Sequence, residues 1–126
     1  MKSKKNFGFT LIELLVVVAL IGVLSAIGLV AFGGLKEASE TKQAETTLQS
    51  IYLAQQEYKS NNGGYYYSSN TNLIVNNLFD GVDDLSEQNY TFTITGNANN
   101  DTLCIRATKS GQTTLYLNHK KKKTNC

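Results

Sequence analysis

The longest hydrophobic stretch of this 126-residue chain lies near its N-terminus. Between Phe9 and Leu35 the only charged residue is Glu13, and the apolar run behind it is about 20 residues long. A helix of that length crosses the roughly 30 Å of hydrocarbon in a bilayer, so the pattern predicts a membrane-spanning helix over residues 9–35. Three of the first five residues are lysines, which predicts that the N-terminus stays in the cytoplasm.

The helical pattern continues beyond the apolar stretch. From residue 35 to residue 58 the apolar positions mostly recur every three or four residues, with charged and amide residues between them. This spacing predicts one helix of about 50 residues, apolar all round in its first half and amphipathic in its second. Gly33-Gly34 at the join is expected to loosen or bend it, and Asn61-Asn62-Gly63-Gly64 is expected to end it. The face predicted to pack consists of Leu35, Ala38, Ala44, Leu48, Ile51, Tyr52 and Tyr58.

Alternating apolar and polar residues in the C-terminal third predict three strands, each with one buried face. They are Tyr90 to Thr95, Leu103 to Ala107, and Leu115 to Leu117. Turn residues separate them at 97–101 and 110–111, so an antiparallel meander is expected to pack on the amphipathic half of the helix. The connection from Tyr65 to Asn89 is expected to be a loop with a short helical turn at 73–79. The fold class is therefore α+β.

The junction between the basic leader and the apolar segment is the most specific motif. An ordinary signal peptide has its cleavage site after the apolar region, whereas here Gly8 precedes it. Residues 8–24, Gly-Phe-Thr-Leu-Ile-Glu-Leu-Leu-Val-Val-Val-Ala-Leu-Ile-Gly-Val-Leu, resemble the N-terminus of the type IV pilin family almost position for position. The resemblance implies a class III leader that a prepilin peptidase cuts between Gly8 and Phe9, methylation of the new N-terminus, and retention of the apolar helix.

The resemblance also implies an organisation and a function. It divides the chain into a leader (1–8), a transmembrane and filament-core helix (9–35) and an extracytoplasmic pilin head (36–126). The implied function is that of a structural subunit of a pilus-like filament serving adhesion, motility or DNA uptake. The subunit would wait in the inner membrane, in contact with lipid, before joining other pilin copies at the cell surface. A type II secretion pseudopilin is an alternative, and an ordinary single-pass anchor with a small exported domain is another.

Glu13 is the one charged residue of the apolar segment. A carboxylate inside a membrane helix costs about 2.5–3.5 kcal/mol on insertion scales, so an acid retained there indicates function. The resemblance implies that it pairs with the N-terminal amine on Phe9 of a neighbouring subunit and thereby sets the register of assembly. The simpler alternative is an acid near the membrane interface that reaches toward the headgroups without a partner.

Charge is unevenly distributed along the chain. The net charge of +2 belongs to the precursor, and loss of three leader lysines leaves nine basic against ten acidic residues. Four of those nine are consecutive, Lys120 to Lys123. Such runs are usually solvated tails, but this one could also contact phosphates, which keeps open a DNA-binding competence pilin.

The two cysteines, Cys104 and Cys126, follow the predicted membrane helix and so would reach the cell exterior. An even number of cysteines in that compartment predicts one disulfide. Two cysteines and one histidine cannot complete a zinc site without carboxylates, and there is no C-x-x-C redox pair. No catalytic or phosphate-binding motif is present, so we expect neither an enzyme nor a cofactor or metal.

Two loop motifs allow more than one interpretation. Tyr65-Tyr66-Tyr67 could bind sugars or bases, although packing on the helix or on a neighbouring subunit is the favoured interpretation. Asp80-Gly81-Val82-Asp83-Asp84 is rich in acids, as calcium loops are. Its spacing does not match an EF-hand loop, so we predict a turn there.

Overall fold

The computed structural model describes residues 8–82, 85 and 88–126. The chain divides into two compact units, one ending at Ala38 and the other spanning Ser39–Cys126. We call the second unit the head. Asp83 and Asp84 of the acidic motif lie outside the described residues.

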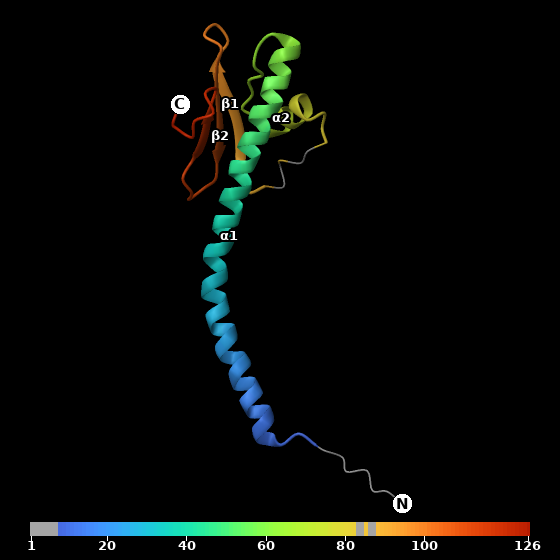
Figure 1. The fold of residues 1–126 in the computed structure, drawn as a ribbon, viewed down its shortest axis with the longest axis vertical. Helices are drawn as coiled ribbons and strands as arrows, with labels where there is room; N and C mark the ends of the chain where they lie inside the picture. Colours follow the sequence, from blue (N-terminus) through green and yellow to red (C-terminus); the bar gives the residue numbers. More distant parts are fainter. Residues whose placement is uncertain (1–7, 83–84, 86–87) are drawn as a thin grey trace, which may run out of the picture. The chain divides into compact units, whose positions relative to one another are not determined.

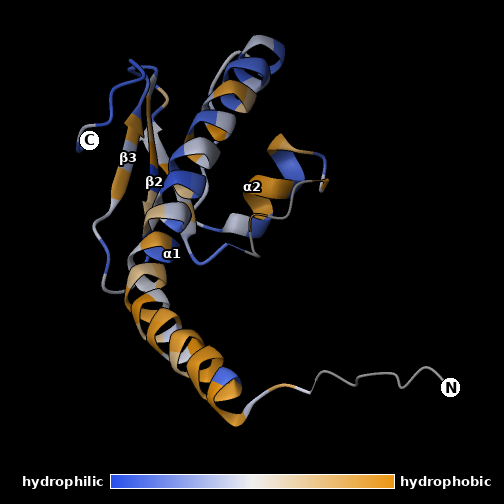
Figure 2. Cartoon of the chain, turned by 60° about the horizontal axis from the view of Figure 1, so that its bottom comes forward, coloured by the Kyte–Doolittle hydropathy of each residue, from blue (hydrophilic) through white to orange (hydrophobic). Residues whose placement is uncertain are grey.

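A single helix, α1 (Leu11–Asn62), is 52 residues long and confirms the predicted long helix. It remains helical through Gly33-Gly34 and ends where the sequence predicts. Gly63 follows it with a φ of 80°, a conformation that favours glycine, and its N–H donates to the carbonyl of Lys59 at 2.8 Å. Among the described residues, α1 is the one helix long and apolar enough to cross a membrane. Figure 2 shows its first part almost uniformly hydrophobic.

A short second helix, α2 (Thr71–Leu78), begins two residues before the predicted turn of helix. Asn70 explains the earlier start, because its side-chain oxygen accepts hydrogen bonds from the backbone N–H groups of Asn72 and Leu73 at 2.9 and 3.4 Å. This is the usual action of an asparagine at a helix N-cap.

The head contains one antiparallel sheet of strands β1 (Thr91–Asn97), β2 (Thr102–Thr108) and β3 (Leu115–Asn118), in that order. Phe92 lies opposite Ala107 and Ile105 opposite Leu117, so the apolar residues of all three strands share one face. The predicted meander is therefore confirmed. Within the head, α2 contacts β1, and the hydroxyl of Thr71 donates to the carbonyl of Phe92 at 3.2 Å. Figure 1 shows the arrangement of α1, α2 and the sheet.

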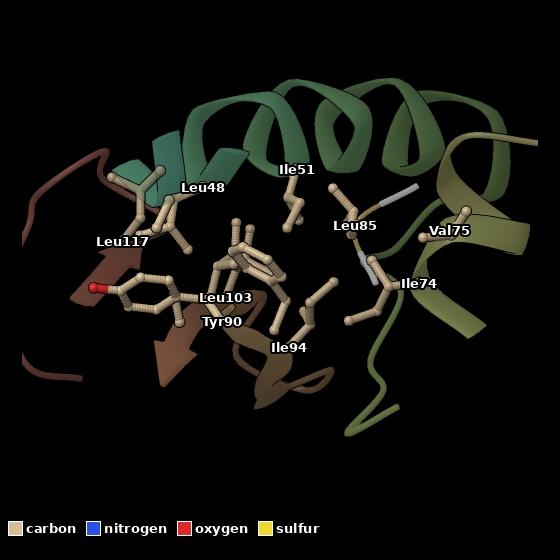
Figure 3. Close-up of a cluster of buried hydrophobic side chains, with 13 residues drawn as sticks. Leu48, Ile51, Ile74, Val75, Leu85, Tyr90, Ile94, Leu103 and Leu117 are labelled. Carbon is tan, nitrogen blue, oxygen red and sulfur yellow. The ribbon is translucent and has the colours of Figure 1, made fainter. Parts of the chain in front are cut away.

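The hydrophobic core of the head forms where α1, the sheet and α2 meet (Figure 3). Helix α1 contributes Ala44, Leu48 and Ile51, as predicted. Leu35 and Ala38 were predicted wrongly, because both belong to the first unit and both are exposed, Leu35 at 62%. Helix α2 supplies Ile74 and Val75. The sheet and loops supply Leu85, Tyr90, Phe92, Ile94, Leu103, Ile105, Ala107 and Leu117.

Two polar residues of α1, Thr47 and Gln55, are also buried, which the apolar pattern did not predict. The hydroxyl of Thr47 bonds to the side-chain oxygen of Gln88 at 3.1 Å. Gln55 donates to the carbonyl of Tyr66 at 2.6 Å and accepts from the N–H of the same residue at 2.9 Å. Burial of these polar groups is tolerated because they are hydrogen-bonded.

Candidate functional site

The predicted processing and assembly residues lie at the start of α1. The hydroxyl of Thr10 accepts from the N–H of Glu13 at 3.3 Å, and the Oε2 atom of Glu13 accepts from the N–H of Thr10 at 3.0 Å. These reciprocal bonds form a capping box, which holds the carboxylate at the positive end of the helix dipole. Sequence reasoning missed Thr10, although T-x-x-E before an apolar run is the signal for this motif.

Gly8 and Phe9 precede this capped turn. Phe9 is 92% exposed, and no atom of the described residues lies within 4 Å of the position that a side-chain Cβ of residue 8 would occupy. Packing within the described chain therefore does not require glycine at this position.

The apolar side chains of the first unit point away from the helix into open surroundings. Those between Leu11 and Val30 are mostly more than half exposed, with Val30 at 84%. An apolar surface of this extent requires lipid or other apolar helices around it.

The two cysteines are joined. Cys104 and Cys126 form a disulfide across 6.0 Å between their Cα atoms. Cys104 alternates with the core residues Leu103 and Ile105, so it lies on the sheet face opposite the core, where it is only 7% exposed. The disulfide therefore fixes the C-terminus to the outer face of the sheet.

The four consecutive lysines belong to a loop that hydrogen bonds to Asn118 hold in place. The side-chain oxygen of Asn118 accepts from the N–H groups of Lys120 and Lys122 at 3.0 and 2.9 Å. The N–H of Asn118 in turn donates to the carbonyl of Lys122 at 3.1 Å. We call residues 118–123 the lysine loop.

One lysine of this loop is bound to the helix. Lys123 lies 3.2 Å from the carboxylate of Glu45, which Lys42 also contacts at 3.1 Å. Hydrogen bonds from Lys42 and Lys123 lower the pKa of the Glu45 carboxyl below its usual value. Lys120, Lys121 and Lys122 are exposed and make no ion pair with any described residue.

The three tyrosines pack against the head, in line with the favoured interpretation. The ring of Tyr66 lies 5.6 Å from that of Tyr58, and the hydroxyl of Tyr67 donates to the carbonyl of Thr102 at 3.0 Å. Burial raises the pKa of Tyr67. Tyr65 packs on the core beneath the ammonium of Lys59, which lies 4.5 Å from the ring centre.

The described part of the acidic motif forms a turn. Asp80 and Gly81 have φ values of 51° and 72°, and the N–H of Val82 donates to the carbonyl of Phe79 at 2.9 Å. Among the described residues, no three His, Cys, Asp or Glu side chains come together in a way that could hold a metal ion.

Comparisons with known proteins found one family model and one similar protein. Residues 3–29 match the family model described as the prokaryotic N-terminal methylation motif. The type IV major pilin protein PilA of Myxococcus xanthus (strain DK1622) is 43% identical over 63 residues, which are 50% of this chain and 29% of that protein. The matched segment thus spans less than a third of that relative, and no solved structure matches the chain. The chain therefore carries the prokaryotic N-terminal methylation motif on an α+β fold of one long apolar helix and a small antiparallel sheet.

Proposed function

We propose that this chain is a structural subunit of a type IV pilus-like filament. The observation that carries the proposal is the methylation motif over residues 3–29, which leads directly into a helix whose apolar side chains are exposed. Such a helix is stable in the inner membrane before assembly and among the helices of other subunits afterwards. In this role the protein is not an enzyme and needs no cofactor.

Processing follows from the same segment. A prepilin peptidase removes residues 1–8, and Phe9 becomes the N-terminus of the mature subunit. The open space around Gly8 supports this assignment, since a glycine that packing does not require is explained by recognition in a peptidase site. The free amine of Phe9 then becomes available to the Glu13 carboxylate of a neighbouring subunit.

The proposal also covers the kind of filament. The disulfide-closed C-terminus, and the absence of a metal-binding cluster among the described residues, favour a pilus subunit over a type II secretion pseudopilin. We propose a cell-surface pilus, with the head exposed to the exterior.

Mass spectrometry of the mature N-terminus tests the proposal. We expect the purified protein to start at Phe9 and to carry one N-terminal methyl group. Gly8→Val should accumulate uncut precursor, whereas the matched change Gly22→Val, at a helix glycine that also has no neighbour within 4 Å, should be processed normally. A mature protein that retains Met1, or that starts after Ala31, would refute the pilin assignment.

A further inference from the structure

The charges of the head are segregated along the sequence. Residues 39–101 contain eight acidic and two basic residues, whereas residues 102–126 contain six basic residues and no acidic one. The second segment comprises β2, β3 and the lysine loop. The basic residues of the head are therefore concentrated in its last 25 residues, and four of them are consecutive in the lysine loop.

Ion pairs within the head neutralise only part of this charge. Lys59 pairs with Asp101 and Lys109 with Glu40, while Lys42 and Lys123 both pair with Glu45. In the described part of the head these pairs leave six charged side chains without an ion pair. They are the basic Arg106, Lys120, Lys121 and Lys122, and the acidic Glu57 and Asp80.

The two unpaired carboxylates line the same hollow. It lies between the last turns of α1 and the end of α2, has a volume of about 290 Å³, and includes Glu57 and Asp80. The side-chain amides of Asn61, Asn62 and Asn77 supply further polar groups, so the lining is mostly polar. Carboxylate and amide oxygens can accept the three hydrogen bonds that a lysine ammonium donates.

The lysine loop lies on the other side of the head. In Figures 1 and 2 the C-terminal segment and α2 are on opposite sides of α1. The unpaired lysines of one chain therefore cannot enter the hollow of the same chain. They are also presented by a loop that hydrogen bonds and a disulfide already fix, so little entropy is lost when a partner binds them.

We propose that the lysine loop of one copy docks into the α1–α2 hollow of the next copy. The contact joins different surfaces of identical heads. Such head-to-tail contacts generate open helical filaments when the rotation between copies does not close into a ring. Complementary charge fixes the register of the contact. The proposal rests on the proposed function as a filament subunit. It assigns another pilin copy, and not duplex DNA, as the partner of the lysine loop.

Cysteine cross-linking of the full-length chain in detergent tests the contact. Lys120→Cys and Glu57→Cys avoid the strained backbone of Lys121 and Asp80, which have positive φ. A chain that carries both changes should give a ladder of dimers, trimers and larger species on oxidation, while each single variant should not. The control pairs Thr113→Cys, exposed on the loop between β2 and β3, with Glu57→Cys, and it should stay monomeric.

The dependence on salt and the effect of charge reversal test whether the contact is electrostatic. The cross-linked fraction should fall several-fold between about 0.1 M and about 1 M salt, over which the Debye length shrinks from about 10 Å to about 3 Å. In full-length chains without added cysteines, cross-linked with a lysine-independent reagent, Lys120→Glu or Glu57→Lys alone should lower the dimer yield relative to wild type. The two changes together should restore it.

Several results would overturn the contact. They are a ladder as strong in the control pair, dimers from Lys120→Cys alone, or filaments that form without any cross-link between residues 120 and 57. Binding of duplex DNA that Lys120→Glu abolishes, together with no ladder from the two-cysteine chain, would assign the loop to DNA instead. If the proposed function is wrong, the N-terminus will remain unprocessed and no filaments will form. The cross-linking assay in detergent does not depend on filaments, so it still tests whether the lysine loop binds the hollow.

Discussion

Replacing Gln55 with leucine tests whether one buried amide holds the tyrosine loop to α1. The side chain is fully buried and makes both of its hydrogen bonds to the backbone of Tyr66. Leucine has a similar size but leaves the N–H and the carbonyl of Tyr66 without those partners. Each buried polar group left unsatisfied costs about 1–3 kcal/mol, so we expect a net loss of about 3 kcal/mol after the gain from a more apolar side chain.

Thermal unfolding measures this loss. All seven tyrosines lie in the head, so near-ultraviolet circular dichroism of the full-length chain in detergent reports on the head. A domain of this size loses about 4–8 °C of Tm per kcal/mol, which predicts a fall on the order of 15 °C. Gln49→Leu, the same change at an exposed position of α1, should shift stability by less than about 0.5 kcal/mol. A loss below about 1 kcal/mol for Gln55→Leu would refute the reasoning.

The change Gln55→Glu adds a test by pH. The new carboxylate still accepts from the N–H of Tyr66, but its other oxygen faces the carbonyl oxygen of Tyr66. That contact and burial both favour the protonated form, so the pKa of the new group rises above the value of about 4.3 for unfolded glutamate. The folded state then binds the proton more tightly than the unfolded state does.

The sign of the pH effect follows from that difference. Relative to wild type, the variant should be most stable below about pH 4.3, where the new group is protonated in both states. Its stability should decline as pH rises toward the folded-state pKa, by up to about 1.4 kcal/mol per pH unit. A difference from wild type that does not change with pH would show that the carbonyl of Tyr66 needs no donor.

Three further changes test the covalent link, the sheet and the membrane segment. Cys126→Ser should lower the stability of the head by about 3 kcal/mol, seen as a lower Tm, and free thiols in the native protein would contradict the disulfide. Gly96→Ala makes its Cβ clash with the carbonyl oxygen of Thr102 in β2, so its Tm should fall by several degrees, whereas Gly64→Ala meets no atom of the described residues within 4 Å and should not lower it. Glu13→Val should leave membrane insertion intact and reduce the number of filaments counted by electron microscopy. A normal filament count would show that the carboxylate is not needed for docking.

The sequence predicted the elements of this fold well because their signals are local. Periodicities of 3.6 and 2 depend on neighbouring residues only, and they located α1 and all three strands. The buried strand face around Phe92 and Ile105 followed from the same alternation. The helical periodicity did not predict where the buried face of α1 begins, because Leu35 has the right spacing but lies outside the head.

The buried polar residues were not predicted, because their burial depends on contacts distant in the sequence. Thr47 and Gln55 look like solvent-facing positions of a helix, and their burial depends on partners 41 and 11 residues away. No local pattern records such a pairing. The lysine loop is similar: a run of like charges predicts a solvated tail, and only the bonds to Asn118 and the pair with Glu45 show that it is held in place.

Glu13 shows how a local role and a functional role can share one side chain. One carboxylate oxygen accepts from the N–H of Thr10 in the same chain, while the other has no hydrogen bond to a described residue and remains available to a neighbour's amine. Glu13→Val removes both roles at once, so a loss of filaments in that variant does not say which one matters. Glu13→Gln separates them, because the amide oxygen can still cap the helix but carries no charge. If docking depends on the ion pair, Glu13→Gln should lose filaments as Glu13→Val does. Filaments that persist in Glu13→Gln and disappear in Glu13→Val would assign the requirement to the capped helix start instead.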